Sequence, residues 1–124
     1  MTTTPLNERL LRFASQIVRL TEEIYRNPTQ RSIALQLSRA CCSIGANYEE
    51  AAAAESDSDF THKMQVALKE ARETLYWLRL LSEITSVPPE RLAPLLQESQ
   101  EIRAMLTAAV MKMKRRLGTL RSSL

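Results

Sequence analysis

A single histidine, His62, limits the metal chemistry that this sequence of 124 residues can support. Asp59 precedes it by three positions, the carboxylate-to-histidine spacing found in di-iron sites of four-helix proteins. Such a site takes this motif from two helices, and one histidine per chain cannot supply both. The two cysteines, Cys41 and Cys42, are adjacent and far from His62, unlike the ligand spacing of a structural zinc site. We therefore expect no metal and no cofactor.

The cysteines are also the strongest candidate nucleophiles. On a helix their side chains point about 100° apart, which disfavours a mutual disulfide. No histidine-type base lies near them in the sequence, and there is neither a Gly-x-Ser-x-Gly elbow nor a phosphate-binding glycine loop. We interpret both as reduced, inert thiols and expect a protein that is not an enzyme. A carboxylate-lined site around Glu50, Glu70 and Glu73 is the less favoured alternative.

Charge is distributed unevenly along a chain whose formal net charge is +3. Residues 49–59 contain five acids and no base, and we call them the acidic segment. From residue 103 onward there are six basic residues and no acid. The dense part of this region gives the candidate nucleic-acid-binding residues: Lys112, Lys114, Arg115, Arg116 and Arg121. Binding to phosphates and a structural role, in which the cations favour a helix C-terminus and pair with the acidic segment, both remain open.

The elements that carry these residues are predicted from composition and periodicity. Two glycines in 124 residues, with many good helix formers, favour helices over hairpins. Apolar residues alternate at spacings of four and three in four stretches, at 5–26, 29–53, 57–85 and 92–117. Short loops between long helices indicate antiparallel neighbours, so we predict one all-α domain over 1–124, an up-down-up-down four-helix bundle. This topology places the acidic segment and the basic run at the same end.

Local signals set the expected helix boundaries. Asn27 is a predicted N-cap of the second helix, with Gln30 as its capping-box partner. Ser56 or Ser58 is expected to cap the third helix. Pro94 is expected in the first turn of the fourth helix, whose regular part is placed from residue 92 after an irregular lead-in, and Gly118 is expected to end the helix.

Two groups of residues do not fit a pattern in which each helix buries a single row of apolar residues, spaced by four and three, within one chain. Asn47 places an amide on the seam of the second helix, and with Glu50 three residues later it is predicted to form a structural polar node bonded to a neighbouring helix. The second half of the third helix is apolar nearly all round, which indicates burial against other subunits. The predicted oligomer interface consists of Val66, Trp77, Leu80 and Ile84. On the first helix a second apolar stripe, Leu11, Ala14, Val18 and Tyr25, also widens the buried face.

Nothing in the sequence indicates secretion or a membrane. The first residues lack the basic and apolar regions of a signal peptide, and no stretch approaches the roughly 18 apolar residues of a membrane span. We expect a cytoplasmic protein with no membrane partner.

Two runs carry a resemblance to a known family. Residues 43–51 read Ser-Ile-x-x-Asn-x-x-Glu-Ala, and residues 73–78 read Glu-Thr-x-Tyr-Trp-Leu. Together they resemble the bacterial four helix bundle protein family, which includes proteins encoded by intervening sequences in large-subunit ribosomal RNA genes. That family is related to the accessory variability determinants of diversity-generating retroelements.

The resemblance implies an up-down bundle assembled as a barrel-shaped homopentamer. In the retroelement branch it implies binding to RNA and to a reverse transcriptase, whereas the ribosomal branch has no established biochemical activity. We therefore predict a non-enzymatic, oligomeric accessory protein that binds RNA or a reverse transcriptase through its basic end. The alternative is a ribosomal RNA intervening-sequence protein without nucleic-acid binding.

Overall fold

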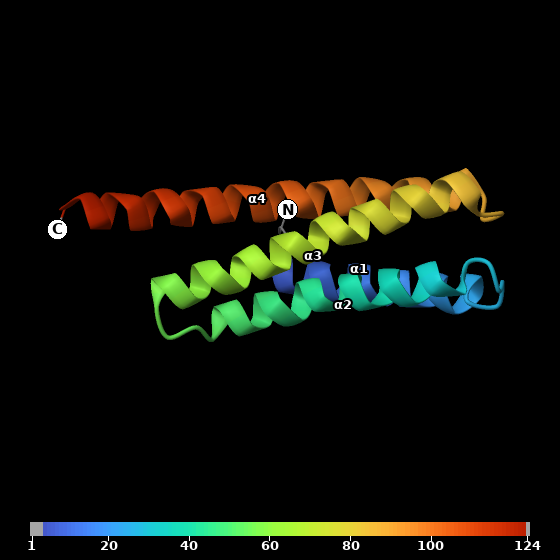
Figure 1. The fold of residues 1–124 in the computed structure, drawn as a ribbon, viewed down its shortest axis with the longest axis horizontal. Helices are drawn as coiled ribbons and strands as arrows, with labels where there is room; N and C mark the ends of the chain where they lie inside the picture. The colour runs from blue at the N-terminus through green and yellow to red at the C-terminus, as the bar shows by residue number, and fades with distance from the viewer. Residues whose placement is uncertain (1–3, 124) are drawn as a thin grey trace.

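Four helices make up the chain in the computed structural model, which describes the backbone of residues 4–123 and the side chains of residues 4–118. They are α1 (Leu6–Ile24), α2 (Arg31–Ala52), α3 (Asp57–Ile84) and α4 (Pro89–Ser123). Successive helices run antiparallel and pack side by side, and α1 and α4 meet to close the bundle (Figure 1). The described residues contain no strand, so the predicted all-α four-helix bundle is confirmed for one chain. No helix in this part of the chain is long and apolar enough to cross a membrane.

The heptad positions form the core that holds the helices together. On α1, every third or fourth residue from Leu10 to Ile24 is at most 4% exposed. Ile44 on α2, Leu78 on α3 and Ile102 on α4 are likewise at most 1% exposed. Because fully burying a large aliphatic side chain contributes about 1.5–3 kcal/mol, this interior supplies most of the stability that fixes the surface residues in place.

The connection between α1 and α2 differs from the predicted capping box. Asn27 closes a separate turn, in which its Oδ1 accepts hydrogen bonds from the backbone N and the hydroxyl of Thr29. Helix α2 begins only at Arg31, after Gln30. The buried Gln30 side chain points across the bundle instead, where Nε2 donates to the Ile84 carbonyl and Oε1 accepts from the Thr85 hydroxyl. Its hydrogen bonds therefore link the loop between α1 and α2 to the loop between α3 and α4.

The start of α3 follows the sequence signal. Ser56 is the N-cap, and its hydroxyl accepts a hydrogen bond from the backbone N of Asp59. Asp57 and Asp59 lie in the first turn, where negative charge favours the helix dipole. The acidic segment thus ends in a well-capped helix that faces the C-terminal half of α4.

Helix α4 is longer than predicted at both ends. It begins at Pro89 rather than at residue 92, and it continues through Gly118 to Ser123. Pro94 lies inside the helix, near its start. Neither described glycine has a positive φ, so Gly118 adopts an ordinary helical conformation and does not end the helix. The last turns of α4 extend past the start of α3, while α1 begins further inward (Figure 1).

Candidate nucleic-acid interface

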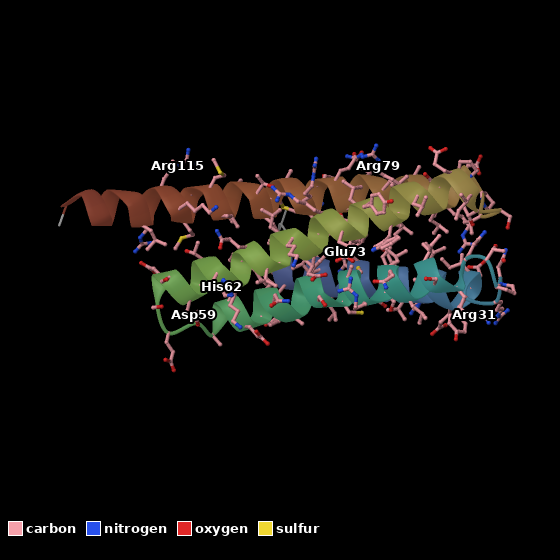
Figure 2. The ribbon with its side chains drawn as sticks, viewed as in Figure 1. Arg31, Asp59, His62, Glu73, Arg79 and Arg115 are labelled. Carbon is pink, nitrogen blue, oxygen red and sulfur yellow. The ribbon has the colours of Figure 1, made fainter. Side chains whose placement is uncertain are left out.

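The predicted phosphate-binding residues come together on one stretch of α4. Lys112, Lys114, Arg115 and Arg116 are all exposed, and we call them the basic end. Arg115 projects from the edge of α4 that faces away from α2 (Figure 2). The fifth predicted residue, Arg121, lies on the helix, but its side chain is outside the described residues. A helical stretch with this density of cations can contact phosphates without reading base sequence.

The basic end lies close to the acidic segment, as the antiparallel topology predicted. Arg116 Nη2 is 3.5 Å from Asp57 Oδ2, and both side chains are about half exposed or more. An exposed ion pair of this kind contributes about 0–1 kcal/mol and leaves the charges available to solvent. Lys112 and Lys114 form no ion pair within the described residues. The acidic segment therefore neutralises only part of the basic end.

A polar cavity of about 470 Å³ adjoins the basic end, between the N-terminal turns of α3 and the C-terminal part of α4. Its lining includes Lys114 of α4 and Ser58, His62 and Gln65 of α3. Figure 2 shows Asp59 and His62 at this end of α3. Among the described residues no group of three or more histidines, cysteines and carboxylates is placed to hold a metal ion. The cavity consequently offers hydrogen-bond donors and a cation, which suit an anion.

The predicted polar node is not formed as expected. Asn47 is half-buried, and its Nδ2 donates to the Ser43 carbonyl one turn earlier on α2. The predicted bond to a neighbouring helix is wrong for the single chain, because a helical amide side chain can reach the carbonyl four residues back. Glu50 makes a separate contact, an ion pair of 3.0 Å with Lys63 of α3.

The three carboxylates of the enzymatic alternative are divided between two ion-pair groups. Arg39 of α2 lies between Glu70 and Glu73 of α3 and pairs with both. The hydrogen bond from Arg39 lowers the pKa of Glu73, which also accepts a bond of 3.2 Å from Trp77 Nε1. This stabilisation is therefore present at neutral pH and is lost as the pH falls through the folded-state pKa. Glu50 is eleven residues from Arg39, about 16 Å along α2, so it does not share this site.

The two cysteines occupy different environments. Cys41 is 1% exposed in the core, and burial raises the pKa of its thiol. Cys42 is exposed on α2, on the surface where α1 and α2 meet. Only a thiolate reacts readily, so burial and a raised pKa both protect Cys41.

We predict that in a Cys42→Ser variant the remaining thiol reacts with a maleimide only as fast as the chain unfolds. The rate should rise steeply with urea concentration, and a Cys41→Ser variant, which keeps the exposed thiol, serves as the comparison. Rapid labelling of Cys41 in native buffer would contradict its buried position.

Exposed apolar side chains gather where α1 and α2 meet. Leu11, Tyr25 and Leu35 are 73%, 43% and 58% exposed. Two shallow cavities lie between them, one lined by Val18 and Leu35 and the other by Leu11 and Cys42. We call this surface the α1–α2 face, formed by the following residues: Leu11, Ala14, Val18, Tyr25, Leu35, Cys42 and Ala46. Its α1 half is the second apolar stripe noted in the sequence.

The residues predicted as the oligomer interface on α3 are less exposed. Val66, Trp77 and Leu80 are half-buried within the single chain, and Trp77 packs against the core. Ile84 is 49% exposed at the end of α3. The amphipathic pattern could not separate burial within the chain from burial against another subunit. The most exposed of the large apolar side chains, that of Leu11, lies on α1 at the α1–α2 face.

One arginine-lined groove was not anticipated. It lies between α1 and α4, where Arg12, Gln16 and Arg19 face Pro94 and Leu95 across a cavity of about 510 Å³. These residues are spaced by four and three on α1, but no motif in the sequence singled them out. Only the position of α4 turns them into one wall of a groove.

Comparisons with known proteins address the fold and the family. A family model described as 23S rRNA-intervening sequence protein matches residues 6–108. A solved structure from Bacteroides thetaiotaomicron, described as a protein with unknown function from the S23 ribosomal protein family, is 35% identical. The match covers 86% of this chain and 98% of that one, with a TM-score of 0.80. No curated protein matches. The basic end lies beyond the residues that the family model matches.

Proposed function

The chain belongs to the 23S rRNA-intervening sequence protein family, and we propose that it acts as a non-enzymatic, homo-oligomeric bundle that binds RNA phosphates at the basic end. The family match ends before the basic end, so the proposal of RNA binding rests on the charges of α4. One observation carries the proposal: α4 presents four exposed cations within five residues, and two of them, Lys112 and Lys114, form no ion pair within the described residues. The division of Glu50, Glu70 and Glu73 between two ion-pair groups supports a role without catalysis.

Self-association would strengthen such binding. The α1–α2 face carries few charges, with Glu22 and Glu49 among its cavity-lining residues, so it suits an apolar surface of another copy of the chain better than a charged partner. Large exposed apolar patches on soluble chains commonly mark such interfaces. A ring of subunits, five if the assembly follows the pentamer implied by the resemblance, repeats the basic end around one side of the assembly. Each added copy raises the local density of positive charge and the avidity for one RNA strand.

The test is RNA binding at low and moderate salt with a variant that reverses three charges of the basic end: Lys114→Glu, Arg115→Glu and Arg116→Glu. We expect the wild-type chain to bind a labelled oligouridylate and to lose affinity steeply as salt rises. The variant should bind at least about tenfold more weakly. Three lost phosphate contacts should also flatten the slope of log K against log salt by about 2, since each contributes about 0.7 for a single strand.

A matched control reverses three charges elsewhere. Lys69, Arg72 and Arg79 are exposed on α3 and form no ion pair within the described residues. Changing all three to Glu alters the net charge by the same amount. An equal loss of affinity in this control would mean that the basic end is not a site. Absence of wild-type binding at low salt would leave the basic run with a structural role only, in the helix dipole and the contact with the acidic segment.

A further inference from the structure

The groove between α1 and α4 is bounded at each end by an ion pair between the two helices. At one end Arg9 of α1 pairs with Glu98 of α4, through a bond of 2.8 Å from Nε to Oε2. At the other end the arginine is on α4 and the glutamate is on α1. There Arg91 donates two hydrogen bonds of 2.8 Å to the Glu23 carboxylate. These bonds lower the pKa of Glu23 and raise the pKa of Arg9. Both carboxylates that line the groove are therefore already satisfied by arginine.

The arginines between the two ion pairs have no such carboxylate partners. The side chains of Arg12 and Arg19 line the groove, are exposed, and form no ion pair or hydrogen bond within the described residues. Gln16 lies between them on the same wall. The lining contains four arginines against two glutamates, and a third carboxylate, that of Glu101, lies 3.5 Å from Arg9, so the groove keeps an excess of one positive charge. A concave surface with unpaired guanidinium groups attracts and concentrates anions.

The shape of the groove narrows the class of anion. Arg12 and Arg19 are seven residues apart, about 10 Å along α1, so one small anion cannot bridge both. A cavity of about 510 Å³ has room for a nucleotide, and Pro94 and Leu95 supply an apolar surface on the opposite wall. Guanidinium groups bind phosphate oxygens in pairs through a planar fork, which suits a chain of phosphates.

The groove also lies on the same side of α4 as part of the basic end. Lys112 follows Pro94 by eighteen residues, which is five whole helical turns, so the two share a side of α4 about 27 Å apart. A long polyanion can therefore contact both places, whereas a short acidic peptide reaches only one. This favours a nucleic-acid strand over an acidic protein segment.

We propose that the α1–α4 groove is a second RNA site, in which Arg12 and Arg19 bind phosphates of a single strand whose bases or sugars lie against Pro94 and Leu95. The inference rests on the proposed function, because it gives the same strand a second and separate point of attachment. The residues differ from those of the basic end, so each site can be removed alone.

The experiment measures fluorescence anisotropy of a labelled single-stranded oligouridylate of about 20 nucleotides. The groove variant is Arg12→Glu with Arg19→Glu. The control is Arg72→Glu with Arg79→Glu, which has the same spacing on an exposed side of α3 and the same change in charge. We expect the groove variant to lose at least about tenfold in affinity and the control to stay within about threefold of the wild type.

A second variant and a second probe make the result specific. The substitutions Arg12→Gln and Arg19→Gln remove the charges without placing new carboxylates beside Glu23 and Glu98, and they should weaken binding in the same direction. Equal losses in the groove and α3 variants would overturn the proposal. So would an oligoglutamate peptide that displaces the RNA as well as an unlabelled oligouridylate of equal charge.

Different results would contradict the proposal for the groove and the proposal for the basic end. If the groove variant binds like the wild type while the triple variant of the basic end does not, the groove proposal is wrong and the proposed function stands. If the reverse holds, the groove is the site and the basic end is not. If the wild-type chain binds no oligouridylate at low salt, both are wrong.

Discussion

Replacing Leu78 with alanine should lower the free energy of unfolding by about 2–5 kcal/mol. Leu78 lies in the last third of α3 and is completely buried. The substitution removes apolar contacts and leaves a cavity that the packed helices cannot fully close. Urea denaturation followed by circular dichroism measures the loss as a lower midpoint at an unchanged slope.

The neighbouring residue provides the control for this measurement. Arg79 is exposed, projects from the edge of the molecule in Figure 2, and forms no ion pair within the described residues. Arg79→Ala should change the free energy of unfolding by less than about 0.5 kcal/mol. Similar effects of the two substitutions would show that α3 does not present Leu78 to the core.

Introducing charge into the α1–α2 face should dissociate the assembly. In the variant Leu11→Glu with Leu35→Glu, each subunit would have to bury two unpaired carboxylates, which is strongly unfavourable. Light scattering coupled to size exclusion should give a multimer for the wild-type chain, about 70 kDa for five chains of 14.1 kDa, and a single chain for the variant. The thiol of Cys42 lies on the same face, so its labelling rate should increase on dissociation.

The corresponding change on α3 tests the other possible interface. Tyr76 and Ile84 are 59% and 49% exposed there. Changing both to Glu should leave the multimer intact if the α1–α2 face is the interface. Dissociation by this pair alone would favour the interface predicted from the sequence on α3. A monomer mass for the wild-type chain at micromolar concentration would contradict self-association altogether.

The sequence predicts the bundle well because helix positions depend on local spacing. The heptad pattern located α1, α2 and α3 to within two residues at each end, and Ser56 is the cap that its position suggested. The errors in α4 arise where one residue was used to set a boundary. Pro94 is tolerated near the start of a helix, so it did not require the start at residue 92, and Gly118 costs only about 1 kcal/mol relative to alanine, so it does not end a long helix.

The surface was harder to predict because it depends on residues far apart in the sequence. Arg9 and Glu98 are separated by 89 positions, and no pattern within either helix indicates that they meet. For the same reason nothing in the sequence indicated that Arg12 and Arg19 form one wall of a groove. The basic end could be found because its residues are contiguous, and its contact with Asp57 followed from topology.

In one ion pair beside the groove the arginine is on α1, and in the other it is on α4. This arrangement favours one direction of α1 relative to α4 during folding. In the native arrangement Arg9 meets Glu98 and Glu23 meets Arg91. If α1 were inserted in the opposite direction along α4, Arg9 would face Arg91 and Glu23 would face Glu98. An apolar seam alone discriminates weakly between these two orientations, whereas like charges brought together disfavour the wrong one. The same residues that border a binding groove therefore also help to exclude a misthreaded bundle during folding.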